Sequence, residues 1–236
     1  MDDAALAVKA SEKGVYTPFS CFICGAMPLI VFPPAHGYNR RKGVPAQRAA
    51  WETEEIRMKV CMLITDGFEE LEAVGTFAIL RRGGVDVDVF SLLDKDATGR
   101  FGLTCTNLKP FSALAMADYQ ALILPGGPEY KAIEASADVQ ALIRAFFEAD
   151  KFVCAICAGP TILGRAGYLK GRDYTCYTAM DADFGGTYHD QYVVRDGKLI
   201  TGRSAAASID FGLAVLEAVA GREAAERTKA DIYYQA

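Results

Sequence analysis

The segment 152–164 contains the residue whose type and position point most directly to chemistry. Its sequence, FVCAICAGPTILG, is an apolar run that ends at Cys157 and continues in a helical pattern from Pro160. Cys157 has small neighbours in the form small-x-nucleophile-x-Gly, which is typical of a sharp strand-to-helix turn that exposes one side chain. A helix start there would stabilise a thiolate and lower its pKa below about 8.5. The alternative for Cys157 alone is a buried structural cysteine.

Glu72 is a second candidate, in the first turn of a helix predicted at 69–82. Glu69 and Glu70 fit an acidic first turn favoured by the helix dipole, whereas Glu72 shares a stripe with apolar positions. Beside a thiolate, Glu72 would help only as a protonated acid that donates a hydrogen bond to sulfur. Burial and the neighbouring negative charge would both raise its pKa in that position.

A glycine pair provides the third feature. Gly126 and Gly127, in LPGGPEY, either form a simple turn or let backbone N–H groups approach a reacting carbonyl. Together with the N–H of Ala158, they would form an oxyanion hole.

Alternating strands and helices must position these residues. The apolar periodicity predicts βαβ units around a mostly parallel, doubly wound α/β sheet, whose ligands bind at the carboxyl ends of the strands. In the first helix we expect Leu71, Val74, Gly75, Ala78 and Ile79 to share one face. Strands are expected at 59–64, 86–92, 103–108, 121–124, 152–156 and 173–177, a hairpin at 191–202, and helices at 69–82, 138–149, 160–165, 206–220 and 222–233.

The composition limits the function classes. With 236 residues and 51% hydrophobic content, one domain with an appendage is favoured over two domains. A net charge of -5 and a pI near 5.2 argue against a nucleic-acid partner. The apolar run 18–34 is broken by Pro28 and is too short for a membrane span, and it makes a poor signal peptide.

The N-terminal segment lies outside the predicted domain. Residues 1–57 lack sustained periodicity, and Met58 directly precedes the first strand. We therefore expect the domain to occupy 58–236, with 1–57 as a disordered or upstream extension; a small packed appendage is the alternative.

The seven cysteines favour a reducing compartment, and we expect a cytoplasmic protein. Cys154 and Cys157 cannot form a disulfide if Cys154 lies in a strand, because their α-carbons would be about 10 Å apart. The remaining strand cysteines are expected to pack in the core. They are Cys61, Cys105, Cys154 and Cys176.

Four motifs together resemble the ThiJ/PfpI superfamily, and within it the DJ-1 proteins. They are ITDGFEELEAV, ALILPGGPE, CAICAGPTILG and GKLITGRSAAASIDFGLAVLEAVAG, in this order, and the similarity runs from Met58 to the C-terminus. The resemblance implies a flavodoxin-like α/β sandwich, a homodimer, and no cofactor or metal. It implies that Cys157 is the nucleophile, Glu72 its protonated partner, and Gly127 and Ala158 the amide donors.

The family's reported activities define two hypotheses. The first is a glyoxalase or deglycase that acts on methylglyoxal-type α-oxoaldehydes or glycated adducts. The second is an oxidative-stress sensor or chaperone in which the same cysteine oxidises to a sulfinate.

Departures from the family pattern bear on that choice. Tyr177 stands where several glyoxalase-active members have histidine, which slightly favours the sensor, and Ala158 replaces the histidine of the protease branch. Because no Cys-His triad and no later His-x-Glu pair are available, protease and glutaminase activities are not expected. Arg203 and Arg82 could attract an anion, although helix-end or surface roles are the simpler interpretation.

Overall fold

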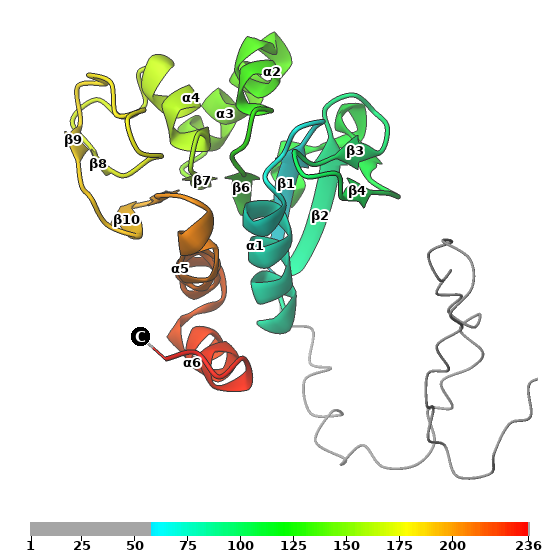
Figure 1. Cartoon of the computed structure of the whole chain (residues 1–236), viewed down its shortest axis with the longest axis vertical. Helices are drawn as coiled ribbons and strands as arrows, with labels where there is room; N and C mark the ends of the chain where they lie inside the picture. The colour runs from blue at the N-terminus through cyan, green and yellow to red at the C-terminus, as the bar shows by residue number, and fades with distance from the viewer. Residues whose placement is uncertain (1–57, 236) are drawn as a thin grey trace, which may run out of the picture. The chain divides into compact units, whose positions relative to one another are not determined.

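A seven-stranded sheet forms the centre of the molecule. The computed structural model describes residues 58–235, in which the strand order is β10-β11-β7-β6-β1-β2-β5 (Figure 1). All neighbouring strands are parallel except β10 and β11, which form an antiparallel hairpin. The strands are β1 (Lys59–Ile64), β2 (Asp86–Ser91), β5 (Lys109–Pro110), β6 (Ala121–Leu124), β7 (Phe152–Ile156), β10 (Val193–Asp196) and β11 (Leu199–Gly202).

Helices cover both faces of this sheet (Figure 1). On one face lie α1 (Glu70–Arg82), α5 (Ser208–Ala220) and α6 (Arg222–Asp231); on the other lie α2 (Tyr130–Ala135), α3 (Ala137–Glu148) and α4 (Gly159–Arg165). Alternate β1 residues enter the two cores: Val60 and Met62 pack on the α1 and α5 side, and Cys61 and Leu63 on the α3 and α4 side. This alternation follows from the two-residue repeat of a strand buried on both faces.

The doubly wound α/β architecture predicted from the sequence is confirmed. The predicted strand at 103–108 shrinks to β4 (Thr104–Cys105), which pairs with β3 (Ala97–Thr98) in a small hairpin outside the main sheet. The predicted strand at 173–177 shrinks to β8 (Asp173–Tyr174). It pairs with β9 (Thr187–Tyr188) in a separate two-stranded sheet.

The apolar face predicted for α1 is buried only in part, with Ile79 and Glu72 inside. Leu71 and Val74 are 55% and 42% exposed, and the helix instead buries a face that contains Glu72. The buried side chains are Glu72, Ala73, Thr76, Ile79 and Leu80. The helix is therefore rotated relative to the most apolar stripe of its sequence, which places a carboxyl group in the interior and leaves leucine and valine outside.

The predictions for 1–57 lie outside the described residues. Between Met58 and Gln235, no helix is both long and apolar enough to span a membrane.

Candidate active site

Three adjacent strands deliver the candidate site residues to one edge of the sheet. In the order β7-β6-β1, the strands are parallel, so their carboxyl ends lie side by side. Glu72 follows β1, Gly126 follows β6, and Cys157 follows β7. The sheet thus brings together residues that are far apart in the sequence, at the edge where doubly wound folds bind ligands.

Cys157 occupies the turn between β7 and α4 with an unusual backbone conformation. Its φ of 63° lies in the left-handed region, which is sterically unfavourable for a non-glycine residue. Two hydrogen bonds hold it there: its N–H donates to the carbonyl of Gly202 at 2.9 Å, and its carbonyl accepts from the N–H of Tyr177 at 2.8 Å. The Cys157 side chain is only 7% exposed. The turn therefore presents the sulfur at the end of the sheet while keeping it largely out of water.

Glu72 lies against this sulfur from α1. The residue is fully buried, its carboxyl group lies beside the Cys157 side chain next to Gly126, and its Oε1 has no hydrogen-bond partner among the described residues. Its Oε2 also accepts the N–H of Gly126 at 2.8 Å. A Cβ added at Gly126 would lie 2.6 Å from both Oε2 of Glu72 and Cβ of Cys157, so this position requires glycine.

Two other backbone amides point at the sulfur of Cys157. The N–H groups of Ala158 and Gly127 lie near it and act to lower the pKa of the thiol, against the effect of burial. Gly127 has a φ of 99°, and an added Cβ would lie 2.5 Å from the carbonyl oxygen of Gly67. Only glycine therefore allows the loop after β6 to direct this amide toward the sulfur.

Cys157 and Glu72 titrate as a coupled pair. Burial raises the pKa of Glu72 from its ordinary 4.5 to about 7, although hydrogen bonds from Cys157 and Gly126 oppose this rise. Burial, followed by the charge of Glu72, raises the pKa of the Cys157 thiol above its usual range, against the effect of the Ala158 and Gly127 amides. The expectation of a lowered pKa for this thiol is therefore wrong beside an ionised Glu72. Near neutral pH the thiol therefore keeps its proton while Glu72 titrates, and the two apparent pKa values belong to the pair.

Comparison with known proteins identifies the family. The profile of the DJ-1/PfpI family matches residues 58–218. The chain belongs to the DJ-1/PfpI family.

Curated relatives and solved structures agree with this assignment. An uncharacterised protein of Methanocaldococcus jannaschii is 35% identical over 68% of this chain and 82% of its own length. A deglycase of Thermococcus kodakarensis is 34% identical over 62% of this chain and 90% of its own. The crystal structure of Drosophila melanogaster DJ-1beta superposes with a TM-score of 0.72, at 26% identity, over 77% of this chain and 100% of that one.

Arg203 lies beside the site but is occupied by other contacts. Its guanidinium forms an ion pair with Asp190 at 2.8 Å and hydrogen bonds to the carbonyl of Cys176 and the hydroxyl groups of Thr178 and Tyr188. These contacts hold the segment that contains Tyr177, whose side chain is 47% exposed. Tyr177 therefore contacts the Cys157 turn through its backbone N–H, which donates to the carbonyl of Cys157.

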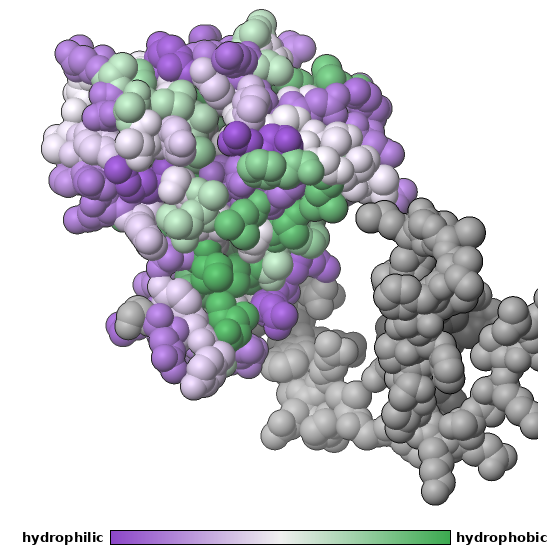
Figure 2. Space-filling model, viewed as in Figure 1, coloured by the Kyte–Doolittle hydropathy of each residue, from purple (hydrophilic) through white to green (hydrophobic). Residues whose placement is uncertain are grey.

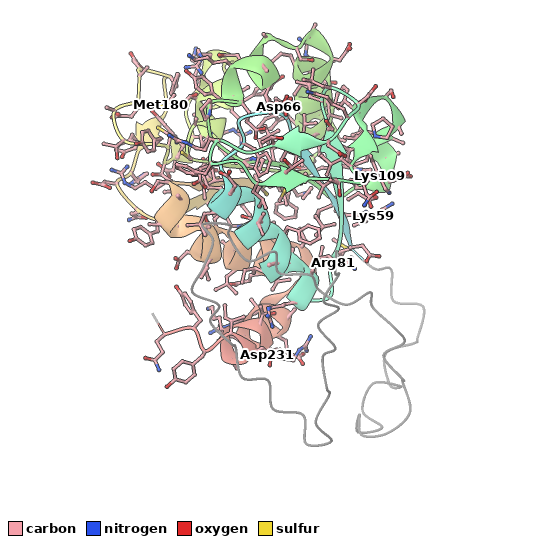
Figure 3. All side chains as sticks on the ribbon, turned by 45° about the vertical axis from the view of Figure 1, so that its right-hand side comes forward. Lys59, Asp66, Arg81, Lys109, Met180 and Asp231 are labelled. Carbon is pink, nitrogen blue, oxygen red and sulfur yellow. The ribbon has the colours of Figure 1, made fainter. Side chains whose placement is uncertain are left out.

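Arg82 has the helix-end position that is the simpler interpretation of its role, and it does not neighbour the site. Arg82 is the last residue of α1 and is exposed, whereas Glu72 is in the first turn, so the two lie about 15 Å apart along the helix axis. Figure 3 labels Asp66 just before the helix and Arg81 near its end, which shows this separation.

No histidine contacts the pair among the described residues. His189 is the histidine in this range, and its Nε2 lies 2.8 Å from Asp173 in the β8–β9 region. Between residues 58 and 235, no three His, Cys, Asp or Glu side chains are grouped as a metal ion would require.

Two contributors to the site were missed in the sequence. Glu69 is the N-cap of α1, and its side chain accepts the N–H of Glu72 at 3.0 Å. Glu129 is 2% exposed, and its Oε2 accepts the N–H of Thr65 at 2.5 Å. The N-cap could have been read from an acid before a helix. Nothing in PGGPEY distinguishes a buried glutamate from an exposed one.

Proposed function

We propose that this protein is a cofactor-independent, cysteine-dependent enzyme that acts on methylglyoxal-type α-oxoaldehydes or on early glycated adducts. The observation that carries the proposal is the buried pair of Cys157 and Glu72, with two backbone amides directed at the sulfur. A thiol beside a base is the arrangement for covalent catalysis on a carbonyl group. Relatives from Thermococcus kodakarensis and Pyrococcus horikoshii that are named deglycases support this substrate class.

The proposed reaction begins with addition of the thiol. A bond forms between Sγ of Cys157 and the aldehyde carbon while the thiol proton passes to the carboxylate of Glu72. The electrons of the C=O double bond move to oxygen, where the N–H groups of Gly127 and Ala158 would stabilise the negative charge. Glu72, with its pKa raised by burial to about 7, suits a group that accepts and returns protons near neutral pH.

The redox change stays within the substrate. Proton transfers by Glu72 convert the thiohemiacetal of methylglyoxal into a thioester, in which the former aldehyde carbon is oxidised and the adjacent ketone carbon is reduced. Water then cleaves the carbon–sulfur bond, which releases lactate and restores the thiol. The sum is methylglyoxal plus water to lactate, so no external oxidant or reductant is needed.

Lactate formation from methylglyoxal tests this function. Wild-type protein should produce lactate, and Cys157→Ser should reduce kcat/KM by at least about a hundredfold, because serine is a far weaker nucleophile beside a base with this pKa. Cys154→Ala is a matched control, since Cys154 is a buried cysteine within β7, the strand that leads to Cys157, and has no role in the proposed reaction. Equal rates of lactate formation for wild type and Cys157→Ser would exclude the proposed cysteine-dependent activity.

A redox sensor is the second candidate function. The described residues supply one acid–base group to Cys157, and an exposed tyrosine stands at position 177. With no second base, slow turnover would leave oxidation of Cys157 to a sulfinate, hydrogen-bonded by protonated Glu72, as the principal chemistry. Peroxide treatment that yields Cys157 sulfinate, from a protein that forms no lactate, would favour this candidate.

We also propose that the protein forms a homodimer through the exposed side of α1. Apolar residues gather on the face where α1 and α5 lie, as Figure 2 shows in green. Near them, Oε1 of Glu70 accepts the N–H of Phe101 at 2.6 Å, which holds the apolar hairpin loop against the start of α1. The exposed apolar residues on α1, on α5 and in the loop between β3 and β4 are Leu71, Val74, Phe101, Leu103 and Ile209.

Sedimentation analysis tests this dimer. An apolar surface of this kind marks a protein interface, so wild type should sediment as a dimer and Val74→Glu as a folded monomer. Monomeric wild type at micromolar concentration would contradict the proposal.

The cytoplasmic location of the protein stays a prediction that rests on its cysteine content.

A further inference from the structure

Glu129 is a second buried carboxyl group close to the reactive pair. It precedes α2 and is 2% exposed. Its Oε2 accepts the N–H of Thr65 at 2.5 Å, and its Oε1 has no hydrogen-bond partner among the described residues. One N–H donor satisfies the carbonyl oxygen of a neutral acid but leaves a buried carboxylate charge largely uncompensated.

Glu129 joins the two loops that build the site. The first loop links β1 to α1 and ends at Glu69; the second links β6 to α2 and contains Gly126 and Gly127. The N–H of Glu69 donates to the carbonyl of Gly126 at 2.9 Å, and the N–H of Glu129 donates to the carbonyl of Gly67 at 3.4 Å. The Glu129 side chain adds the link to Thr65, at the end of β1.

Among residues 58–235, no positively charged side chain contributes to lowering the pKa of Glu129. Burial raises its pKa well above the ordinary value, and the charge of Glu72 adds to that rise. The nearby acids add no positive charge: Asp66 binds Lys95 and the N–H of Thr98, and Glu69 caps α1. Farther along α2, Glu134 pairs with Arg165 of α4 at the surface.

We propose that Glu129, as an uncharged carboxylic acid, is a positioning residue that fastens the β1–α1 loop to the β6–α2 loop and thereby holds the Gly126 amide and Glu72 in place beside Cys157. A neutral acid is suited to this role because a second charge here would repel the shared charge of the reactive pair. The turnover part of the proposal rests on the proposed function, whereas thiol reactivity does not.

Two substitutions separate the acid's neutrality from its positioning role. Glu129→Gln keeps the size, the acceptor for Thr65 and zero charge, whereas Glu129→Leu removes the acceptor. Glu134→Gln is a control in α2, the helix that Glu129 precedes, since it removes an ion pair with Arg165 at the surface. For each full-length protein, the rate of Cys157 alkylation by iodoacetamide is followed by peptide mass spectrometry across pH, together with lactate formation.

Each outcome decides the proposal. Glu129→Gln should keep both inflections of the wild-type alkylation profile and a rate within about twofold of wild type, whereas Glu129→Leu should lose about tenfold in turnover. An inflection that falls by about one pH unit or more in Glu129→Gln would show that Glu129 is ionised and overturn the proposal.

The positioning role has a separate test. Wild-type turnover in Glu129→Leu would overturn it. If Glu129→Leu does not fold, Glu129→Asp, which withdraws the acid from Thr65 by one methylene, should show the loss, and full activity would overturn the role. Absence of lactate from wild type would refute the proposed function alone, because the alkylation profiles would still test Glu129.

Discussion

Replacement of Glu72 by glutamine should change how protein stability depends on pH. In the folded protein, burial raises the pKa of Glu72 from 4.5 to about 7. In the unfolded chain the carboxyl group has its ordinary pKa, so between these pH values the folded state binds more protons. By linkage, this group's contribution to the free energy of unfolding is fully present below pH 4.5 and is lost as pH rises through about 7.

The magnitude follows from the pKa difference. One pKa unit corresponds to about 1.4 kcal/mol, so the rise from 4.5 to about 7 at a fully buried group corresponds to about 3 kcal/mol. Glutamine keeps the side-chain size and an acceptor for the N–H of Gly126, but it does not titrate. The stability of Glu72→Gln relative to wild type should therefore increase by about 3 kcal/mol between about pH 4.5 and about pH 8.

Urea unfolding of both proteins across this pH range provides the assay. The difference between the two proteins reports the titration of Glu72 together with the pKa changes that its removal causes at Cys157 and Glu129, since the remaining titrating groups are common to both. Glu134→Gln, at an exposed ion pair, serves as the control and should show a nearly constant difference from wild type. A constant difference for Glu72→Gln as well, or one that declines as pH rises, would refute the assignment of a raised pKa to Glu72.

Three further predictions follow from the same geometry. Gly126→Ala should lower lactate formation by at least about tenfold, because the added methyl collides with Glu72 and Cys157, whereas Gly84→Ala, with open space around it, should retain activity in the folded fraction. Alkylation of Cys157 should rise in two steps with pH in wild type and in one step in Glu72→Gln, since only wild type has a coupled pair; identical profiles would contradict the coupling. Ser136→Ala should lower the free energy of unfolding by about 1 kcal/mol, because the Ser136 hydroxyl caps α3, and an unchanged urea midpoint would exclude this cap.

The sequence predicted the central sheet well because its strands are buried on both faces. β1, β6 and β7 are short continuous apolar runs, and the structure places them at the predicted residues. The turn at Cys157 could be predicted because the small residues Ala155, Ala158 and Gly159 allow the sharp strand-to-helix turn that larger side chains would obstruct. Local composition is sufficient in these places, since neither neighbouring segments nor charge decides the outcome.

The face of α1 could not be predicted from local pattern. Leu71 and Val74 are the more apolar side chains, yet packing against α5 and the sheet buries Glu72 and Thr76 instead. The energy of that arrangement includes hydrogen bonds to Gly126 and Cys157, which are distant in sequence. The spacing of apolar residues along the helix carries no information about these contacts with residues distant in sequence.

The protonation of the site was equally beyond the sequence. The prediction of a stabilised thiolate considered the helix start, but burial and an adjacent carboxylate act in the opposite direction on Cys157. The buried acid Glu129 was not anticipated, because its burial depends on the packing of two loops.

The most direct test of the central claim, that Cys157 adds to the substrate carbonyl and Glu72 moves the protons, is carbon NMR of Glu72→Gln with methylglyoxal labelled at the aldehyde carbon. The variant should accumulate a thiohemiacetal signal in stoichiometric amount with the protein and form no lactate. The signal should be absent from the double variant that combines Glu72→Gln with Cys157→Ser. A variant that forms lactate at the wild-type rate, or a thiohemiacetal signal that persists without Cys157, would contradict the claim.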